Sequence, residues 1–286
     1  MLYPVVALLA LLVAVPVIHV VVASLYRRNL FQVRPPRWVG LENYYYLVTS
    51  AKFEVAILRS MSFTVTALAV ELALGIALAV WVHRMRRLPG MGLLRTVLAM
   101  PILVAPVVAA VMWRFMFQPD FGILNHFITG LGLPPVGWLS SPSIALLAIV
   151  LIDVWQWTPL VFLTVLAGLH AIPPQYFEAA ELDAAGPWKQ TLHVALPQVR
   201  RVIVIVALLR LIDLLRAFEI IVATTQGGPG DASYTFPVMI WETAFVAFEI
   251  GDAAAASVVL LVLVSVIVTL LVRAIARQGV VGRGQG

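Results

Sequence analysis

Residues 176–197 read YFEAAELDAAGPWKQTLHVALP and form a polar island between long apolar segments. The first half, around Glu178 and Glu181, consists of residues that favour a helix, and the dipeptide Gly186-Pro187 is typical of a turn. We expect a short helix, a turn and a second short helix that ends at Leu196-Pro197. Because the flanking segments are apolar enough for lipid, the island must project into water and contact another molecule there. The alternative, an ordinary loop between membrane helices, requires no helical pattern of charged residues.

The composition places the chain in a membrane. Of its 286 residues, 62% are hydrophobic and 12% are charged, and the mean hydropathy is +1.00. Soluble proteins are about one quarter charged. The chain has no cysteine, which excludes disulfides and thiol chemistry, and the lack of His/Cys clusters argues against a metal centre. We expect an all-α membrane protein without a cofactor.

The apolar residues form six runs of the length, about 20 residues, that crosses a bilayer as a helix. The first run is too long for a signal-peptide core and lacks a basic N-terminal region, so we interpret it as a true span. Residues 1–286 then form a single transmembrane domain, whose expected spans are 2–25, 60–82, 94–117, 143–168, 202–224 and 252–275.

Basic residues predict the orientation. The expected external segments, 118–142 and 226–250, contain no Lys or Arg. Basic residues gather instead after the second span, around the island and in the tail: Arg84, Arg86, Arg87, Arg95, Lys189, Arg200, Arg201, Arg273, Arg277 and Arg283. Cytoplasmic segments carry this excess, so the island and the C-terminus are expected in the cytoplasm. The segment 27–59 is an exception, because it holds six basic residues and yet lies on the external side of the membrane in this orientation. The other loops agree with one another, and we base the orientation on them. Basic residues at span ends are topology signals, so the net charge of +5 does not indicate nucleic-acid binding.

Four charged residues recur at steps of three in the fifth expected span: Arg210, Asp213, Arg216 and Glu219. Charges at membrane depth are costly and usually face a bundle interior or a wet cavity. Two structural ion pairs, Arg210 with Asp213 and Arg216 with Glu219, are an equally weighted alternative. Because each step of three turns the position by roughly 60° around a helix, all four cannot face one small ligand.

The fourth expected span carries Asp153, Trp155, Gln156 and Trp157. Aromatic faces stack on sugars, and Asp and Gln exchange hydrogen bonds with hydroxyl groups, so these residues suit a carbohydrate path. The alternative role for the tryptophans is anchoring at the membrane interface. The expected substrate path comprises Asp153, Trp155, Gln156, Trp157, Arg210, Asp213 and Arg216. Glu71, in the second span, is expected to make a polar contact between helices.

The island also resembles a family signature, E-A-A, three residues, G, nine residues, I, any residue, L-P. Glu178, Ala179, Ala180, Leu196 and Pro197 match it, whereas Ala184 replaces the glycine and Val194 the isoleucine. The glycine at 186 is expected to supply the missing flexibility. This signature is similar to that of the inner-membrane permease subunits of ATP-binding-cassette importers. The resemblance implies that loop 170–201 couples to an ATPase through Glu178, Ala179, Ala180, Asp183, Ala184, Gly186, Leu196 and Pro197.

Further pieces resemble the first permease of carbohydrate importers, the class that includes maltose, trehalose and glycerol-3-phosphate systems. They are VGLENY at Val39–Tyr44, FGILN at Phe121–Asn125, DVWQWTP at Asp153–Pro159 and TTQGGPG at Thr224–Gly230. The resemblance implies half of a translocation path for a sugar in a bacterial or archaeal cytoplasmic membrane. It also implies a second homologous permease, an ATPase dimer that hydrolyses ATP on separate chains, and an external substrate-binding protein.

Rival functions fit less well. A secondary transporter needs no docking island and often consists of two related halves. We find no convincing internal repeat in this sequence. A membrane hydrolase needs an HExxH or GxSxG motif, and the sequence has neither. A permease for a non-sugar solute such as glycerol-3-phosphate is the alternative that the sequence leaves open.

Overall fold

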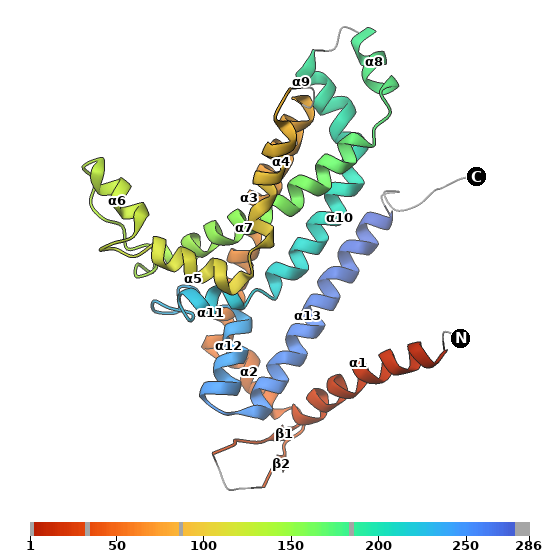
Figure 1. The fold of residues 1–286 in the computed structure, drawn as a ribbon. Helices are drawn as coiled ribbons and strands as arrows, with labels where there is room; N and C mark the ends of the chain where they lie inside the picture. The colour runs from red at the N-terminus through yellow and green to blue at the C-terminus, as the bar shows by residue number, and fades with distance from the viewer. Residues whose placement is uncertain (1–2, 32–34, 86–87, 183–185, 278–286) are drawn as a thin grey trace. The chain divides into compact units, whose positions relative to one another are not determined.

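The computed structural model describes residues 3–31, 35–85, 88–182 and 186–277. Helices dominate these residues (Figure 1). The strands β1 (Tyr26–Arg27) and β2 (Arg37–Trp38) form one antiparallel pair, with Tyr26 opposite Trp38. Helices suit apolar segments because each backbone N–H and C=O is then bonded inside its own segment. The expected all-helical class is confirmed.

Among the described residues, four helical segments are long and apolar enough to cross a membrane. They are α3 (Ala51–Arg84), α7 (Ala145–His170), the run Pro187–Leu215, and α13 (Ile250–Arg277). A bent pair of helices between Met91 and Met116 raises the number to five if the pair is one span. The first expected span corresponds to the apolar helix α1 (Tyr3–Ala23).

The segment expected as one span over 94–117 is broken. It consists of α4 (Met91–Ala99), a 3-10 turn η1 (Met100–Leu103) and α5 (Pro106–Met116), with a bend of 97° between the two parts. Pro106 begins α5, and Ala105 before it is extended at φ −61° and ψ 139°. Proline has no N–H to donate and disfavours the helical conformation of the residue before it, which accounts for the break.

The span expected over 202–224 is also different. The helix α9 (Pro187–Gln190) continues through a π-helical turn, η2 (Thr191–Ala195), into α10 (Leu196–Leu215). The second island helix therefore does not end at Leu196-Pro197. The run ends instead at Leu215, and α11 (Glu219–Thr224) follows after three residues.

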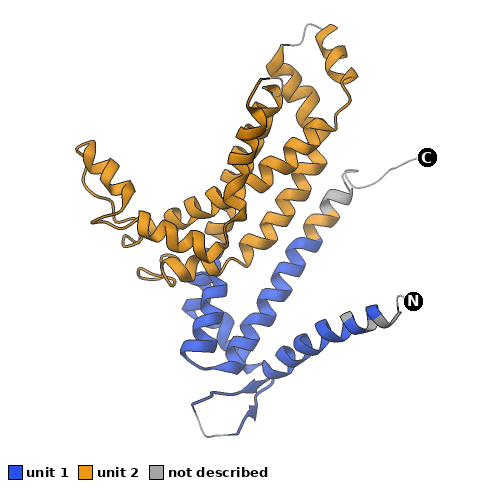
Figure 2. Ribbon diagram, in the orientation of Figure 1, with its two compact units in different colours: residues 1–60, 234–269 blue, residues 61–233, 270–286 orange. Residues whose placement is uncertain are grey.

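The chain divides into two compact units, shown in Figure 2. The first holds residues 1–60 and 234–269, with α1, α2 (Glu42–Thr49), α12 (Phe236–Trp241), a π-helical turn η3 (Glu242–Val246) and most of α13. Buried Asn43 donates to the carbonyls of Ser24 and Tyr26 at 2.8 and 3.1 Å. These bonds join α2 to the end of α1.

The second unit holds residues 61–233 and 270–286, with α4 to α11, the short helices α6 (Ile123–Gly130) and α8 (Gln175–Leu182) among them. Its central helix is α7, which is buried along most of its length against residues of α3 and α10. A side chain at Gly75 of α3 would lie 2.6 Å from Val161 of α7, so glycine is needed there for the close approach. The core that results holds the candidate site between these three helices.

Candidate coupling and translocation site

A buried guanidinium lies between three helices of the second unit. Arg210 of α10 donates from Nε and Nη2 to the two carboxylate oxygens of Glu71 on α3, both at 2.7 Å. Nη2 also donates to Oδ2 of Asp153 on α7 at 2.7 Å. The Arg210 side chain is 1% exposed. Burying a charge is costly unless it is paired and hydrogen-bonded, and two carboxylates meet this requirement here. We call Glu71, Asp153 and Arg210 the charged cluster.

An aromatic ring covers the charged cluster. Cζ of Arg210 lies 4.8 Å from the centroid of the Trp157 ring, which is within cation–π range. Trp157 comes from α7, one turn after Asp153. The edge of the guanidinium thus bonds to two carboxylates and its face lies against an indole ring. These contacts together fix its orientation.

The charged cluster borders a cavity of about 260 Å³. We call it the path cavity. Its lining comes from the start of α5, from one face of α7 and from the stretch between the end of α10 and the start of α11. The lining residues are Pro106; Asp153, Gln156 and Trp157; and Arg210, Asp213, Arg216, Ala217, Phe218, Glu219 and Ile220. The break between α10 and α11 therefore forms part of the wall. In membrane proteins, backbone outside regular helices is tolerated where it is buried or lines a wet cavity.

Six of the seven residues expected in the substrate path line the path cavity; Trp155 does not. Its ring packs against Trp113 of α5, with centroids 5.7 Å apart and an angle of 67°. The spacing of these residues along the helix could have separated Trp155 from the other three α7 residues on the basis of the sequence. Residues 153, 156 and 157 share a face because they are three and four apart, whereas 155 points elsewhere.

Gln156 has a second contact at the break in the α4–α5 segment. Its Nε2 donates to the carbonyl of Val104 at 2.6 Å, and Val104 follows the 3-10 turn η1. Its Oε1 is buried without a hydrogen-bond partner among the described residues. One end of the amide thus satisfies a carbonyl freed by the break.

Of the two ion pairs considered as an alternative within the fifth span, one is present. Arg210 Nη1 lies 3.7 Å from Oδ2 of Asp213, the longest of its ion-pair contacts. The ion pairs of the described residues do not include Arg216 with Glu219. Both of these side chains are exposed beside the break. Glu71 makes the helix–helix contact expected of it, and its pairing with Arg210 is the part that sequence reasoning missed.

The first island helix, α8, presents part of its expected coupling set to solvent. Glu178 and Ala179 are exposed, whereas Ala180 is buried. Ala180 therefore packs within this chain. Leu182 at the end of α8 is 90% exposed. Asp183 and Ala184 lie outside the described residues.

The second half of the island joins the core. Gly186 precedes α9 in an extended conformation, φ −64° and ψ 163°, which any residue adopts. No backbone angle that only glycine can adopt is used at this position, and the flexibility expected of Gly186 stays a prediction. Leu196 packs against the core cluster of α3, α7 and α10, and Pro197 is exposed in the first turn of α10.

Sequence comparison identifies relatives for this chain. Residues 71–280 match the family described as binding-protein-dependent transport system inner membrane component. The chain is 34% identical to the trehalose/maltose transport system permease protein MalF of Thermococcus litoralis over 88% of this chain and 83% of that protein. It is 32% identical to the sn-glycerol-3-phosphate transport system permease protein UgpA of Yersinia enterocolitica over 79% of this chain and 76% of that protein.

Solved structures share the fold. A chain in the crystal structure of a bacterial ABC transporter involved in the import of the acidic polysaccharide alginate superposes with a TM-score of 0.86 at 21% identity, over 97% of this chain and 94% of that chain. A chain of the MetNI methionine ABC transporter in an inward-facing conformation superposes with a TM-score of 0.60 at 16% identity, over 84% of this chain and 98% of that chain.

Proposed function

This chain belongs to the family of binding-protein-dependent transport system inner membrane components, and on that premise we propose that it forms half of the path by which an ATP-driven importer moves a carbohydrate across the cytoplasmic membrane. A second homologous permease completes the path. ATP is hydrolysed on a separate ATPase dimer, and an external binding protein delivers the solute.

The path cavity is the observation that carries this proposal. It combines an indole face at Trp157, a carboxylate at Asp153 and the amide of Gln156 with exposed charges at the α10–α11 break. Sugars present apolar faces and hydroxyl groups, which these side chains suit. Ligand sites of transporters often lie at such helix breaks. The cavity supports a role for this chain in contacting the solute, with the second permease supplying the opposite wall.

The charges of the path cavity favour a sugar over glycerol-3-phosphate, the second candidate. Its lining includes three carboxylates, at Asp153, Asp213 and Glu219, and two guanidiniums. Arg210 is already engaged by Glu71 and Asp153. A phosphate would therefore meet more negative than positive charge on this chain, which disfavours it. The trehalose and maltose systems among the relatives agree with the sugar assignment. Because another relative belongs to a glycerol-3-phosphate system, the experiment below includes that solute as well.

The island is proposed to dock on the ATPase in the cytoplasm. Its basic surroundings support this side of the membrane. Glu178 and Glu181 give the exposed face of α8 negative charge, while Leu182 and Trp188, 90% and 64% exposed, offer large apolar side chains in a polar segment. Exposed apolar residues rimmed by charges are typical of protein interfaces.

Reconstitution of the full importer tests the proposal. The chain is co-expressed with its ATPase, second permease and binding protein, purified as a complex and placed in lipid nanodiscs. We expect ATP hydrolysis to rise when the binding protein carries trehalose or maltose, and to remain at its basal rate with glycerol-3-phosphate.

Two results would contradict the proposal differently. Stimulation by glycerol-3-phosphate alone would replace the carbohydrate with the second candidate. A wild-type chain that is folded but retains no ATPase during purification would reject the importer assembly as a whole.

A further inference from the structure

The end of α3 is joined to the island by one side chain. Arg84 is the last residue of α3, and its Nη2 donates to the carbonyl of Pro187 in α9 and to Oγ1 of Thr191 at 2.6 Å. Its guanidinium also lies over the ring of Trp188, 5.6 Å from the centroid. Three contacts with one short segment indicate a specific attachment, which a basic residue acting only as a topology signal does not require.

The attachment falls on an irregular part of the helix. Thr191 is buried and is the first residue of the π-helical turn η2. Its hydroxyl also donates to the carbonyl of Pro187 at 3.1 Å, so both acceptors of Arg84 belong to one turn. Single π-helical turns often mark functional positions in helices. Hydrogen bonds from a charged donor are stronger than neutral ones, which suits Arg84 to holding this turn.

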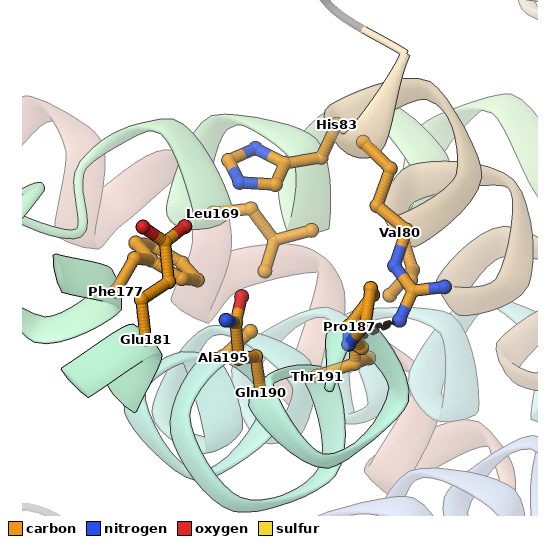
Figure 3. Close-up of a pocket in the computed structure, with 10 residues that line it drawn as sticks. Val80, His83, Leu169, Phe177, Glu181, Pro187, Gln190, Thr191 and Ala195 are labelled. Atoms are coloured by element: carbon orange, nitrogen blue, oxygen red, sulfur yellow. Dashed lines mark hydrogen bonds between the residues drawn. The ribbon is translucent and has the colours of Figure 1, made fainter. Parts of the chain in front are cut away.

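A cavity separates this attachment from the first island helix. It has a volume of about 280 Å³ and lies between the ends of α3 and α7, α8 and α9. In Figure 3, Phe177 and Glu181 of α8 lie on one side of the cavity and Pro187 on the other. Arg84 therefore attaches α3 to the second half of the island and not across the cavity to α8.

The same two helical segments meet again at the charged cluster. Glu71 of α3 lies thirteen residues before Arg84, about 20 Å away along the helix. Its partner Arg210 belongs to the run Pro187–Leu215, which also contains Thr191. Two attachments at separate heights restrict both sliding and rotation of one helix against the other.

We propose that Arg84 is a positioning residue for coupling: by tying α3 to Pro187 and Thr191, it makes α3 and the run Pro187–Leu215 move together, so that displacement of the island reaches the charged cluster. This inference rests on the proposed function, because it requires the ATPase to move the island. Removal of the tie lets α9 move without α3, and ATP hydrolysis then continues with less transport.

Double-mutant analysis of the reconstituted importer tests the tie. Arg84→Ala removes the donor, and Thr191→Val removes the acceptor hydroxyl while keeping the shape and charge of the chain. Arg273→Ala and Thr96→Val are the matched controls, because they remove an exposed arginine from the end of another helix and a hydroxyl from α4. The measured quantity is substrate transported per ATP hydrolysed.

We expect Arg84→Ala to lower that ratio at least about fivefold, with assembly and ATP hydrolysis retained. Thr191→Val lowers it in the same direction, the double variant is no worse than Arg84→Ala, and Arg84→Lys restores part of the ratio. The controls match the wild type. A wild-type ratio in Arg84→Ala, or strictly additive losses in the double variant, would overturn the inference.

Spin labels supply a readout of position. The chain has no cysteine, so Trp81→Cys on α3 and Leu192→Cys on η2, both at exposed positions, label single sites. The distance distribution between them is expected to broaden in Arg84→Ala, and an unchanged distribution would reject the tie. Failure of the wild-type chain to bind an ATPase would reject the proposed function, whereas wild-type transport with unaltered coupling in Arg84→Ala rejects the role of Arg84 alone.

Discussion

Arg210 on α10 and Glu71 on α3 form a two-pronged ion pair with both N···O distances at 2.7 Å, although the residues are 139 positions apart in the sequence. The planar guanidinium fixes direction as well as distance in such a pair. The pair therefore sets the rotation of α3 relative to α10 in the second unit and brings the third helix, α7, into register through Asp153.

Removal of Glu71 is expected to destabilise the chain strongly. Glu71→Ala leaves Arg210 buried with fewer partners, and breaking a buried pair costs about 3–5 kcal/mol. The measurement is the thermal stability of the detergent-solubilised complex by fluorescence-detected size-exclusion chromatography. The control is Asp213→Ala, because this carboxylate is 53% exposed and 3.7 Å from Arg210. Its loss should cost less than about 1 kcal/mol. Equal shifts in the two variants would contradict a specific role for the Glu71 pair.

Charge reversal in the island is expected to release the ATPase. Glu178→Arg places a cation on the exposed face of α8, and a reversed charge at an interface should weaken binding by about tenfold or more. Co-purification measures this loss, with the second permease expected to stay bound. Asp120→Arg, an exposed reversal in the segment expected outside the membrane, serves as the control. Normal ATPase binding by Glu178→Arg would reject docking through this face.

Loss of the Gln156 amide is expected to disturb the break near Val104. Gln156→Leu removes the bond to the Val104 carbonyl, and an unsatisfied buried polar group costs about 1–3 kcal/mol. The same thermal assay measures the effect. Gln198→Leu, at an exposed position of α10, should show little change. A fully stable Gln156→Leu variant would mean that water or another group satisfies the carbonyl.

The two neighbouring tryptophans of α7 are expected to separate in function. Trp157→Ala removes an aromatic face of the path cavity and should lower sugar transport about fivefold to tenfold, while Trp157→Phe retains most activity. Trp155→Ala should lower stability, because it loses the contact with Trp113, and leave the choice of sugar unchanged. Proteoliposome uptake of labelled trehalose and maltose distinguishes these results; equal transport losses at both positions would contradict the assignment.

The helical class and the island are readable from the sequence, because runs of about 20 apolar residues indicate membrane helices and a charged interruption between two of them indicates a segment in water. The break before Pro106 is harder, since proline in a membrane helix often causes only a kink. The prolines at 101 and 106 mark the place without giving the 97° bend. The end of α10 at Leu215 has no proline or glycine beside it, so no local signal in the sequence marks it.

The candidate site, too, is only partly predictable from the sequence. Spacing along one helix separates Trp155 from its neighbours, so the sequence contains that distinction. It does not contain the charged cluster, because Glu71, Asp153 and Arg210 lie on three helices whose rotations are set by packing. Arg84 is one of several basic residues in its stretch of sequence, with others at 86, 87 and 95, and only the position of α9 distinguishes it.

The unbroken run Pro187–Leu215 has a geometric consequence for the second unit. Its 29 residues span about 43 Å at 1.5 Å per residue. If such a rod tilts by about 10° around its midpoint, each end is displaced by about 4 Å, and the ends go in opposite directions. A pull at Pro187 toward one side would then push Arg216 and the adjoining wall of the path cavity toward the other, by more than the width of a water molecule.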